Sequence, residues 1–167
     1  MSIRILITGG TFDKEYNELK GTLTFHKTHI MEILKQGRVK VPVKVENVEM
    51  IDSLDMVLND RLLILARCQK AMEKRIVITH GTDTMVETAK VLGEQVGKTL
   101  RGKTIVLTGA MVPYTFGNSD AMLNLGSAMA FTQSLPAGVY IAMNGKYFVW
   151  KNVRKNKRKG IFESLKR

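Results

Sequence analysis

Residues 76–84 read IVITHGTDT, a short apolar run that ends in a glycine-containing turn rich in hydroxyl groups. An aliphatic run of this length, bounded by a turn, is typical of a buried parallel strand. Residues 3–11 read IRILITGGT and repeat the arrangement. In an open α/β sheet the strands end along one edge, where ligands bind, so we expect Thr11 and Thr82 to face one site.

Along the rest of the chain, apolar runs alternate with segments of helical periodicity. Strands are expected at 43–50, 104–108 and 138–143, helices at 27–36, 59–72, 84–96 and 120–132, a loop at 12–24, and a sixth strand or hairpin arm at 146–150. This alternation predicts a three-layer α/β/α fold with a mostly parallel sheet and right-handed crossovers. Residues 1–167 are expected to form one domain.

Composition limits the class of protein. With 44% hydrophobic residues in 167, the chain can form one sizeable core. No stretch approaches the roughly 20 apolar residues of a membrane span, and no signal-peptide pattern precedes the first strand, so we expect a cytoplasmic protein. The single cysteine, Cys68, cannot form an internal disulfide and is expected in the core.

The net charge of +11 is concentrated at the carboxyl end, from about residue 146. Nine of the 26 lysines and arginines lie there, and Glu163 is the only acid among them. Such a segment can bind nucleic acid or an acidic partner, or form a solvated edge. No recognition helix, zinc-finger spacing or aromatic-interleaved motif accompanies it, so the sequence does not favour nucleic acid.

Motifs for cofactors and metals are incomplete. No Gly-x-Gly-x-x-Gly pattern occurs, and residues 93–99 resemble a phosphate loop but have one residue too few and follow a helix. His26 and His29 lack a third ligand, so we expect no metal and no cofactor. Ser119 or Asp120 is expected to cap the helix that follows.

The two turns could use their threonines in two ways. A threonine hydroxyl is a weak nucleophile and needs a base, which Lys155 could supply because neighbouring cations disfavour its charged form. Asp83 could orient that amine, in the manner of a Ser-His-Asp triad. Gly10 and Gly81 would let backbone amides approach a ligand closely. Alternatively, both are ordinary turns, and Thr82 or Asp83 caps a helix.

Together the motifs resemble the L-asparaginase family. The matching segments are TGGT at 8–11, DSLDM at 52–56, HGTDT at 80–84, TGAM at 108–111, residues 119–120 and 124–125, and residues 138–144 with the basic stretch beyond. The resemblance implies the fold of the asparaginase N-terminal domain. It also implies a hydrolase that releases ammonia from L-asparagine through a threonine nucleophile and an acyl-enzyme.

The resemblance assigns a role to each catalytic candidate. Thr11 falls on the nucleophile, and Thr82, Asp83 and Lys155 fall on the group that activates the attacking species. The register of the lysine is open, since Lys151 and Lys157 lie near it. Tyr16 is the candidate for the loop tyrosine that partners the nucleophile, and a solvated tyrosine is the alternative.

Substrate contacts are also implied. Ser53 matches a serine that binds the α-carboxylate, Asp83 would hold the α-amino group, and Ala110 matches a backbone contact near the leaving amide. Gly10 and Gly81 belong to the same binding surface. Leu54 stands where many members have a glutamine. The sequence does not rank asparagine against glutamine as the substrate, because the one methylene by which they differ changes binding by only about 1 to 3 kcal/mol.

The chain has about half the usual length of the family, so the usual C-terminal domain is expected to be absent. That domain normally supplies an acid near the loop tyrosine, which Asp13 or Glu15 could replace here. We therefore expect a homo-oligomer that shields the site. The alternative function is a weakly active module that binds nucleic acid or an acidic partner through its basic segment, or an amidase acting on glutamine.

Overall fold

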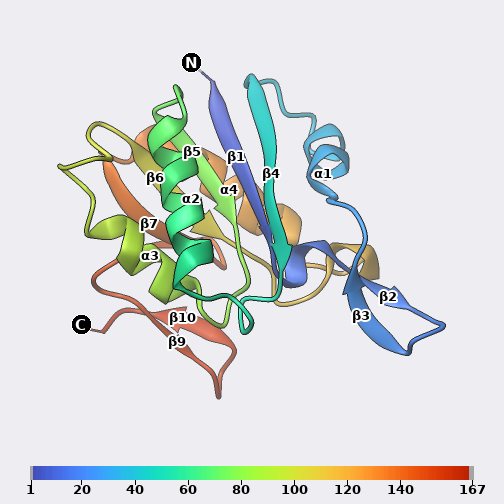
Figure 1. The fold of residues 1–167 in the computed structure, drawn as a ribbon. Coiled ribbons are helices and arrows are strands. Elements are labelled where there is room, and N and C mark those ends of the chain that lie inside the picture. The colour runs from blue at the N-terminus through green and yellow to red at the C-terminus, as the bar shows by residue number, and fades with distance from the viewer. Residues whose placement is uncertain (1, 166–167) are drawn as a thin grey trace.

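The centre of the molecule is a six-stranded sheet with the strand order β4-β1-β5-β6-β7-β8 (Figure 1). A computed structural model describes residues 2–165. In sheet order, the strands are β4 (Val43–Ile51), β1 (Ile3–Gly9), β5 (Arg75–Thr79), β6 (Thr104–Thr108), β7 (Gly138–Met143) and β8 (Lys146–Val149). The first five are parallel and β8 is antiparallel to β7, which confirms the predicted, mostly parallel sheet.

Helices cover both faces of this sheet. The pair α2 (Leu58–Lys70) and α3 (Met85–Gly93) packs on one face, and the pair α1 (Ile30–Gln36) and α4 (Ala121–Ser134) packs on the other. Successive side chains of a strand point to opposite faces. In β5, accordingly, Ile76 and Ile78 join the first core while Val77 joins the second. The three-layer prediction is confirmed, and Cys68 is fully buried in the first core as expected.

The prediction of a loop over residues 12–24 is wrong. A short 3-10 helix, η1 (Thr11–Asp13), leads into two antiparallel strands, β2 (Lys14–Asn17) and β3 (Thr22–Phe25), which project from the body of the molecule (Figure 1). We call residues 14–25 the arm. Each strand has only four residues, none of them buried, so the sequence carries too short an apolar period to reveal them.

A second hairpin follows the sheet at the carboxyl end. Its strands are β9 (Arg154–Asn156) and β10 (Ile161–Glu163), within the segment that was expected only to be basic. Phe162 of β10 is buried in the core beneath α2 and α3 and anchors the hairpin to the body. Within residues 2–165, no helix is long and apolar enough to cross a membrane.

Candidate functional site

Turns from neighbouring strands pack directly against one another at the carboxyl edge of the sheet. A Cβ atom placed on Gly10 would lie 2.3 Å from the Gly81 nitrogen, and one on Gly81 would lie 2.4 Å from Ser53 Oγ. One on Gly109 would lie 2.5 Å from the His80 carbonyl oxygen. Only glycine permits this approach. The turns after β1, β4, β5 and β6 therefore form one junction, as the strand pattern predicted for the first and third.

Lys155 joins this junction from the carboxyl-terminal hairpin. Its Nζ donates hydrogen bonds of 2.8 Å to both Thr82 Oγ1 and Asp83 Oδ1. The lysine side chain is only 10% exposed, whereas that of Asp83 is 37% exposed. Lys155 pairs with Phe162 in the hairpin register, so the buried phenylalanine fixes where the amine lies.

The other lysines considered for this position are placed differently. Lys151 and Lys157 are both exposed to solvent. The structure therefore brings Lys155, and not its neighbours, to the threonine and the aspartate.

Thr82 and Asp83 do not cap a helix. Helix α3 begins at Met85, and the residue that precedes it is Thr84. The Thr84 hydroxyl donates a 2.7 Å hydrogen bond to the Ser53 carbonyl oxygen, which ties the β5 turn to the β4 turn. The interpretation of Thr82 or Asp83 as an N-cap is therefore wrong, and both side chains are available to Lys155.

Thr11 opens onto the same edge. It follows Gly10, whose φ of 80° lies in the region that favours glycine, and its partly exposed side chain makes no hydrogen bond within residues 2–165. Ser53 is 1% exposed, and its hydroxyl likewise has no hydrogen-bond partner in the described part of the chain. Because buried polar groups are nearly always satisfied, an unpartnered hydroxyl at a junction of turns indicates a place for a polar ligand.

Ala110 is buried and belongs to a turn held in place by Asp120, which precedes α4, and by Asn124 of α4. The Asp120 carboxylate accepts hydrogen bonds of 3.0 to 3.1 Å from the amides of Met111 and Val112. It stands at the N-cap position but caps no helix amide, so the predicted capping role is wrong for Asp120. Ser119 does accept a hydrogen bond from the first helical amide, at 3.0 Å.

Asn124 completes this support; the sequence matched it to the family but indicated no role for it. Its Nδ2 donates to the Gly109 carbonyl oxygen, and its Oδ1 accepts from the Asn144 amide, both at 2.9 Å. An asparagine among the apolar residues of the first turns of this helix, where the side chain is fully buried, was the signal that could have revealed it.

Tyr16 lies on the arm and not in a loop. It is 61% exposed and stands opposite Leu23 in the antiparallel register. An ion pair between Lys14 and Asp52 joins the base of the arm to the turn that carries Ser53. The tyrosine is therefore tied to the junction through its strand, while its own ring faces solvent.

Neither acid considered as a partner for Tyr16 is free. The buried Asp13 accepts hydrogen bonds from the His29 amide, at 2.9 Å, and from the Thr28 hydroxyl, at 3.1 Å, and burial raises the pKa of its carboxyl. Glu15 Oε1 lies 2.8 Å from His29 Nε2. Both acids fasten η1 and the arm to the start of α1.

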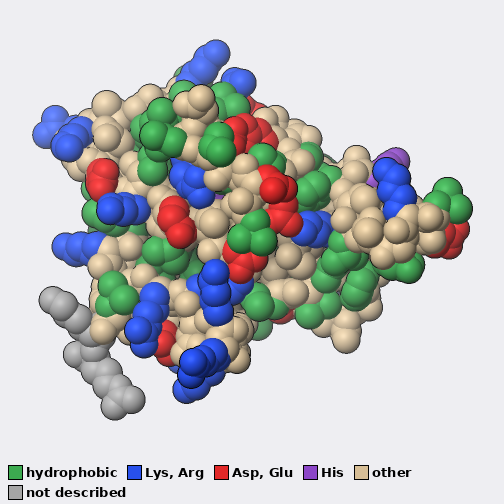
Figure 2. Space-filling view, turned by 60° about the horizontal axis from the view of Figure 1, so that its bottom comes forward, with side chains coloured by type: hydrophobic (Ala, Val, Ile, Leu, Met, Phe, Trp, Pro, Cys, Tyr) green, Lys and Arg blue, Asp and Glu red, His purple; other side chains and the backbone are tan. Residues whose placement is uncertain are grey.

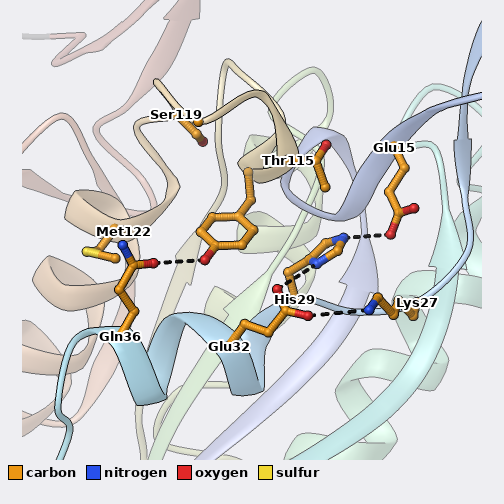
Figure 3. A pocket seen from close by; sticks show the side chains of 10 residues that line it. Glu15, Lys27, His29, Glu32, Gln36, Thr115, Ser119 and Met122 are labelled. Atoms are coloured by element: carbon orange, nitrogen blue, oxygen red, sulfur yellow. Dashed lines mark hydrogen bonds and ion pairs between the residues drawn. The ribbon is translucent and has the colours of Figure 1, made fainter.

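A pocket of about 590 Å³ lies between α1, the arm and the turn around Tyr114 (Figure 3). None of the predicted site residues lines it. Four of its polar residues pair with one another, since Tyr114 donates to Gln36 at 2.8 Å and Lys27 donates to Glu32 at 3.3 Å. Among residues 2–165, no three His, Cys, Asp or Glu side chains are placed to bind one metal ion. The pocket is separate from the junction of turns.

His80 is fully buried beneath the junction. Its Nδ1 lies 2.7 Å from the Gly81 carbonyl oxygen, and its Nε2 lies 2.7 Å from the Thr88 hydroxyl. Burial, and to a lesser extent the nearby Arg61 guanidinium, lower the pKa of the imidazole to about 4. The ring is therefore neutral at pH 7 and buttresses the turn that carries Thr82.

This lowered pKa predicts a loss of stability in mild acid. Between pH 6.5 and about 4, the unfolded chain binds a proton on His80 that the folded chain does not, so the free energy of unfolding falls as the pH falls. The free energy of unfolding should therefore be higher above pH 6.5 than near pH 4, and His80 accounts for up to about 3 kcal/mol of this difference. Urea unfolding across this range measures it, and an NMR titration of His80 checks the cause. An imidazole that titrates near 6.5 in the folded protein contradicts the prediction.

The fold and the junction define an α/β protein with a candidate ligand site at the carboxyl edge of a parallel sheet, where turns present threonine hydroxyls. The chain belongs to the asparaginase family: the family described as "Asparaginase, N-terminal" matches residues 2–165.

Several relatives are similar over nearly the whole chain. The L-asparaginase of Thermococcus kodakarensis is 29% identical over 99% of this chain and 51% of its own length. Its solved structure superposes with a TM-score of 0.86 over 100% of this chain and 52% of that structure's chain. The probable periplasmic L-asparaginase of Haemophilus influenzae is 35% identical over 92% of this chain and 46% of its own length. The structure of a probable cytoplasmic L-asparaginase from Campylobacter jejuni is 31% identical in sequence and superposes with a TM-score of 0.83, over 98% of this chain and 53% of its own. The chain thus spans about half the length of the relatives that it matches.

Proposed function

We propose that the chain is an amidohydrolase that converts L-asparagine and water into L-aspartate and ammonia at this junction. The observation that carries the proposal is the pair of 2.8 Å hydrogen bonds from Lys155 to Thr82 and Asp83. A lysine held at once by a hydroxyl and a carboxylate, at a junction whose first turn carries a second threonine with no hydrogen bond to its hydroxyl within residues 2–165, has the components of nucleophilic amide hydrolysis. Membership of the asparaginase family supports the choice of an amide as substrate.

In the proposed reaction, Thr11 is the nucleophile. Its oxygen forms a bond to the side-chain amide carbon of asparagine while its proton passes to a base, and the amide nitrogen takes up a proton and leaves as ammonia. Water then attacks the aspartyl ester, which frees aspartate and restores the hydroxyl. Lys155 is proposed as the base: held by Asp83, its amine takes up the proton of the Thr82 hydroxyl, and Thr82 in turn takes up the proton of Thr11.

The remaining residues of the junction are proposed to bind the substrate. The unpartnered hydroxyl of Ser53 can donate to the α-carboxylate, and the partly exposed carboxylate of Asp83 can hold the α-ammonium group. The backbone amide of Gly81 can stabilise the oxyanion, whereas the amide of Gly10 already donates a 3.1 Å hydrogen bond to the Ile51 carbonyl oxygen, so Gly10 is proposed only to let the turns approach the substrate closely. The backbone at Ala110 is proposed to contact the leaving amide.

Ammonia release from purified protein tests this function. The chain is assayed with L-asparagine, L-glutamine and D-asparagine at equal concentrations. We expect release from L-asparagine, whereas faster release from L-glutamine would retain the chemistry and change the substrate. Absence of release from all three amides would show that the proposed function is wrong.

One observation favours a second function, the binding of nucleic acid or another acidic partner. The hairpin that positions Lys155 also carries the exposed side chains of Arg154, Lys157, Arg158 and Lys159. Binding through these cations would weaken steeply with salt. Replacing Lys157, Arg158 and Lys159 with glutamine should then abolish the association without changing ammonia release.

We propose the cytoplasm as the location of this protein. The names of its relatives include a probable cytoplasmic asparaginase, which supports this location, and a probable periplasmic one. Fractionation of cells that express the chain with its natural ends tests the location.

A further inference from the structure

Arg61 is a buried cation without an acidic partner. It lies in the first turn of α2 and is 9% exposed. Its Nη1 donates a 2.8 Å hydrogen bond to the Met56 carbonyl oxygen, whereas its Nε is buried and has no hydrogen-bond partner within residues 2–165. No acidic side chain in that part of the chain forms an ion pair with it. The proposed reaction gives this charge no role.

The acids that stand near Arg61 in the sequence bind other groups. The Asp60 carboxylate accepts a 2.7 Å hydrogen bond from the Val57 amide, and Asp52 forms its ion pair with Lys14. Figure 2 shows acidic and basic side chains interspersed on the surface of one face, where water and salt screen their charges. The guanidinium of Arg61 is largely withdrawn from water, so neither a partner nor solvent balances its charge.

Such a placement destabilises the fold. Removing a charged group from water has a large free-energy cost, which a paired acid normally offsets. The first turn of a helix adds to this cost, because the positive end of the helix dipole disfavours a cation there. A single hydrogen bond to a carbonyl oxygen offsets neither effect. Stability therefore does not account for Arg61, whereas a negatively charged ligand would supply the missing partner.

The charge lies close to two turns of the junction. Arg61 binds the carbonyl oxygen of Met56, whose amide donates a 3.4 Å hydrogen bond to the carbonyl oxygen of Ser53. The buried, unpartnered hydroxyl of Ser53 therefore belongs to the turn that the guanidinium holds. Burial, and with it the Arg61 guanidinium, lowers the pKa of His80, whose ring lies against the Gly81 carbonyl oxygen. The electrostatic effect of Arg61 thus reaches the next turn as well.

We propose that Arg61 is a positioning residue that prepares the turn around Ser53 for a carboxylate. Its hydrogen bond to Met56 fixes the turn, and its unbalanced charge favours an anionic group at the Ser53 hydroxyl over a neutral or cationic one. In the proposed reaction this group is the α-carboxylate of asparagine, so the inference rests on the proposed function. It adds a determinant of substrate class, because amides that carry a carboxylate are favoured over simple amides.

Substrate binding in Arg61→Met tests the proposal, since methionine removes the charge and keeps much of the stem. The carboxylate is bound before and during the reaction, so KM for L-asparagine should rise about ten-fold while kcat stays within about two-fold of wild type. The affinity for the product L-aspartate, measured by calorimetry, should fall by about the same factor. Arg61→Lys retains the charge and should restore both values to within about three-fold of wild type.

Urea unfolding separates this role from a purely structural one. The midpoint of Arg61→Met should be equal to or above that of wild type, because an unbalanced buried charge has been removed. A residue that served only the fold would lower it. Arg67→Met is the matched control on the same helix, since the Arg67 side chain is 43% exposed and lies 3.6 Å from Glu46. This control should leave KM and the affinity for L-aspartate unchanged.

Three results would overturn the proposal: an Arg61→Met protein that binds L-aspartate as tightly as wild type, one whose urea midpoint lies below wild type, or an equal loss of affinity in Arg67→Met. Failure of the proposed function gives a different pattern. A wild-type protein that binds L-aspartate but releases no ammonia contradicts the proposed function alone. An active wild type whose KM and affinity are unaffected by Arg61→Met contradicts the role of Arg61 alone.

Discussion

Thr11→Val is expected to abolish ammonia release from L-asparagine, with a loss of about 10⁴-fold or more, the scale on which removal of a nucleophile acts. Valine has nearly the shape of threonine but no hydroxyl, so no aspartyl ester can form. Because the Thr11 side chain makes no hydrogen bond within residues 2–165 and is partly exposed, the free energy of unfolding should change by less than about 1 kcal/mol.

The matched control for Thr11→Val is Thr22→Val, at an exposed threonine of the arm. It should retain full activity. Steady-state ammonia release and urea unfolding of both variants separate chemistry from stability. A Thr11→Val protein with wild-type turnover would assign the nucleophile elsewhere.

Lys155→Met is expected to lower ammonia release by about 10³-fold or more, which is the scale for loss of a catalytic base. Methionine can fill the mostly buried space of the lysine stem but cannot exchange a proton with Thr82. The Asp83 carboxylate loses its ion pair but is partly exposed to water, so it does not become an unpaired buried charge. The hairpin should persist, since Phe162 still anchors it.

Lys157→Met provides the control for charge, because it removes an exposed cation two residues further along the same hairpin. Its ammonia release should stay within about two-fold of wild type, as expected for a surface substitution. Equal losses in both lysine variants would mean that the net charge of the hairpin, and not the amine at Thr82, supports activity. Truncation after Arg158 is no substitute for this pair, since it would remove β10 and with it the pairing partner of Lys155.

Much of the fold could be predicted because its core strands are continuous apolar runs. Strands β6 and β7 begin and end where the sequence indicates. All five residues of β6 and all six residues of β7 are buried, so each strand has a continuous apolar run. The arm and the carboxyl-terminal hairpin were missed as strands because their residues are mainly polar or exposed. Their position depends on a few anchors, such as Phe162 and the Lys14–Asp52 ion pair.

The candidate site could be predicted where residues directly follow buried strands. Thr11 and Thr82 lie just past the carboxyl ends of β1 and β5, so the parallel sheet alone places their turns at one edge, whereas Ser53 follows the half-buried β4 and was assigned only by the resemblance. The lysine was ambiguous because its register depends on the pairing of β9 with β10, which no apolar period marks.

The residues that hold the turns of the site in place could not be predicted from the sequence either. Asp120 holds the turn beyond Ala110, because its carboxylate accepts from backbone amides nine and eight residues earlier and from no backbone amide of the helix that it precedes. A capping position in the sequence does not specify which amides a carboxylate will accept from.

The most direct test of the central claim is ammonia release from L-asparagine, measured in one series for wild type, Thr11→Val, Lys155→Met and Lys157→Met. If the junction of turns is the active site of an asparaginase, wild type and Lys157→Met release ammonia and the other two do not. A wild-type protein that releases none, or a series in which all four proteins are equally active, would contradict the account.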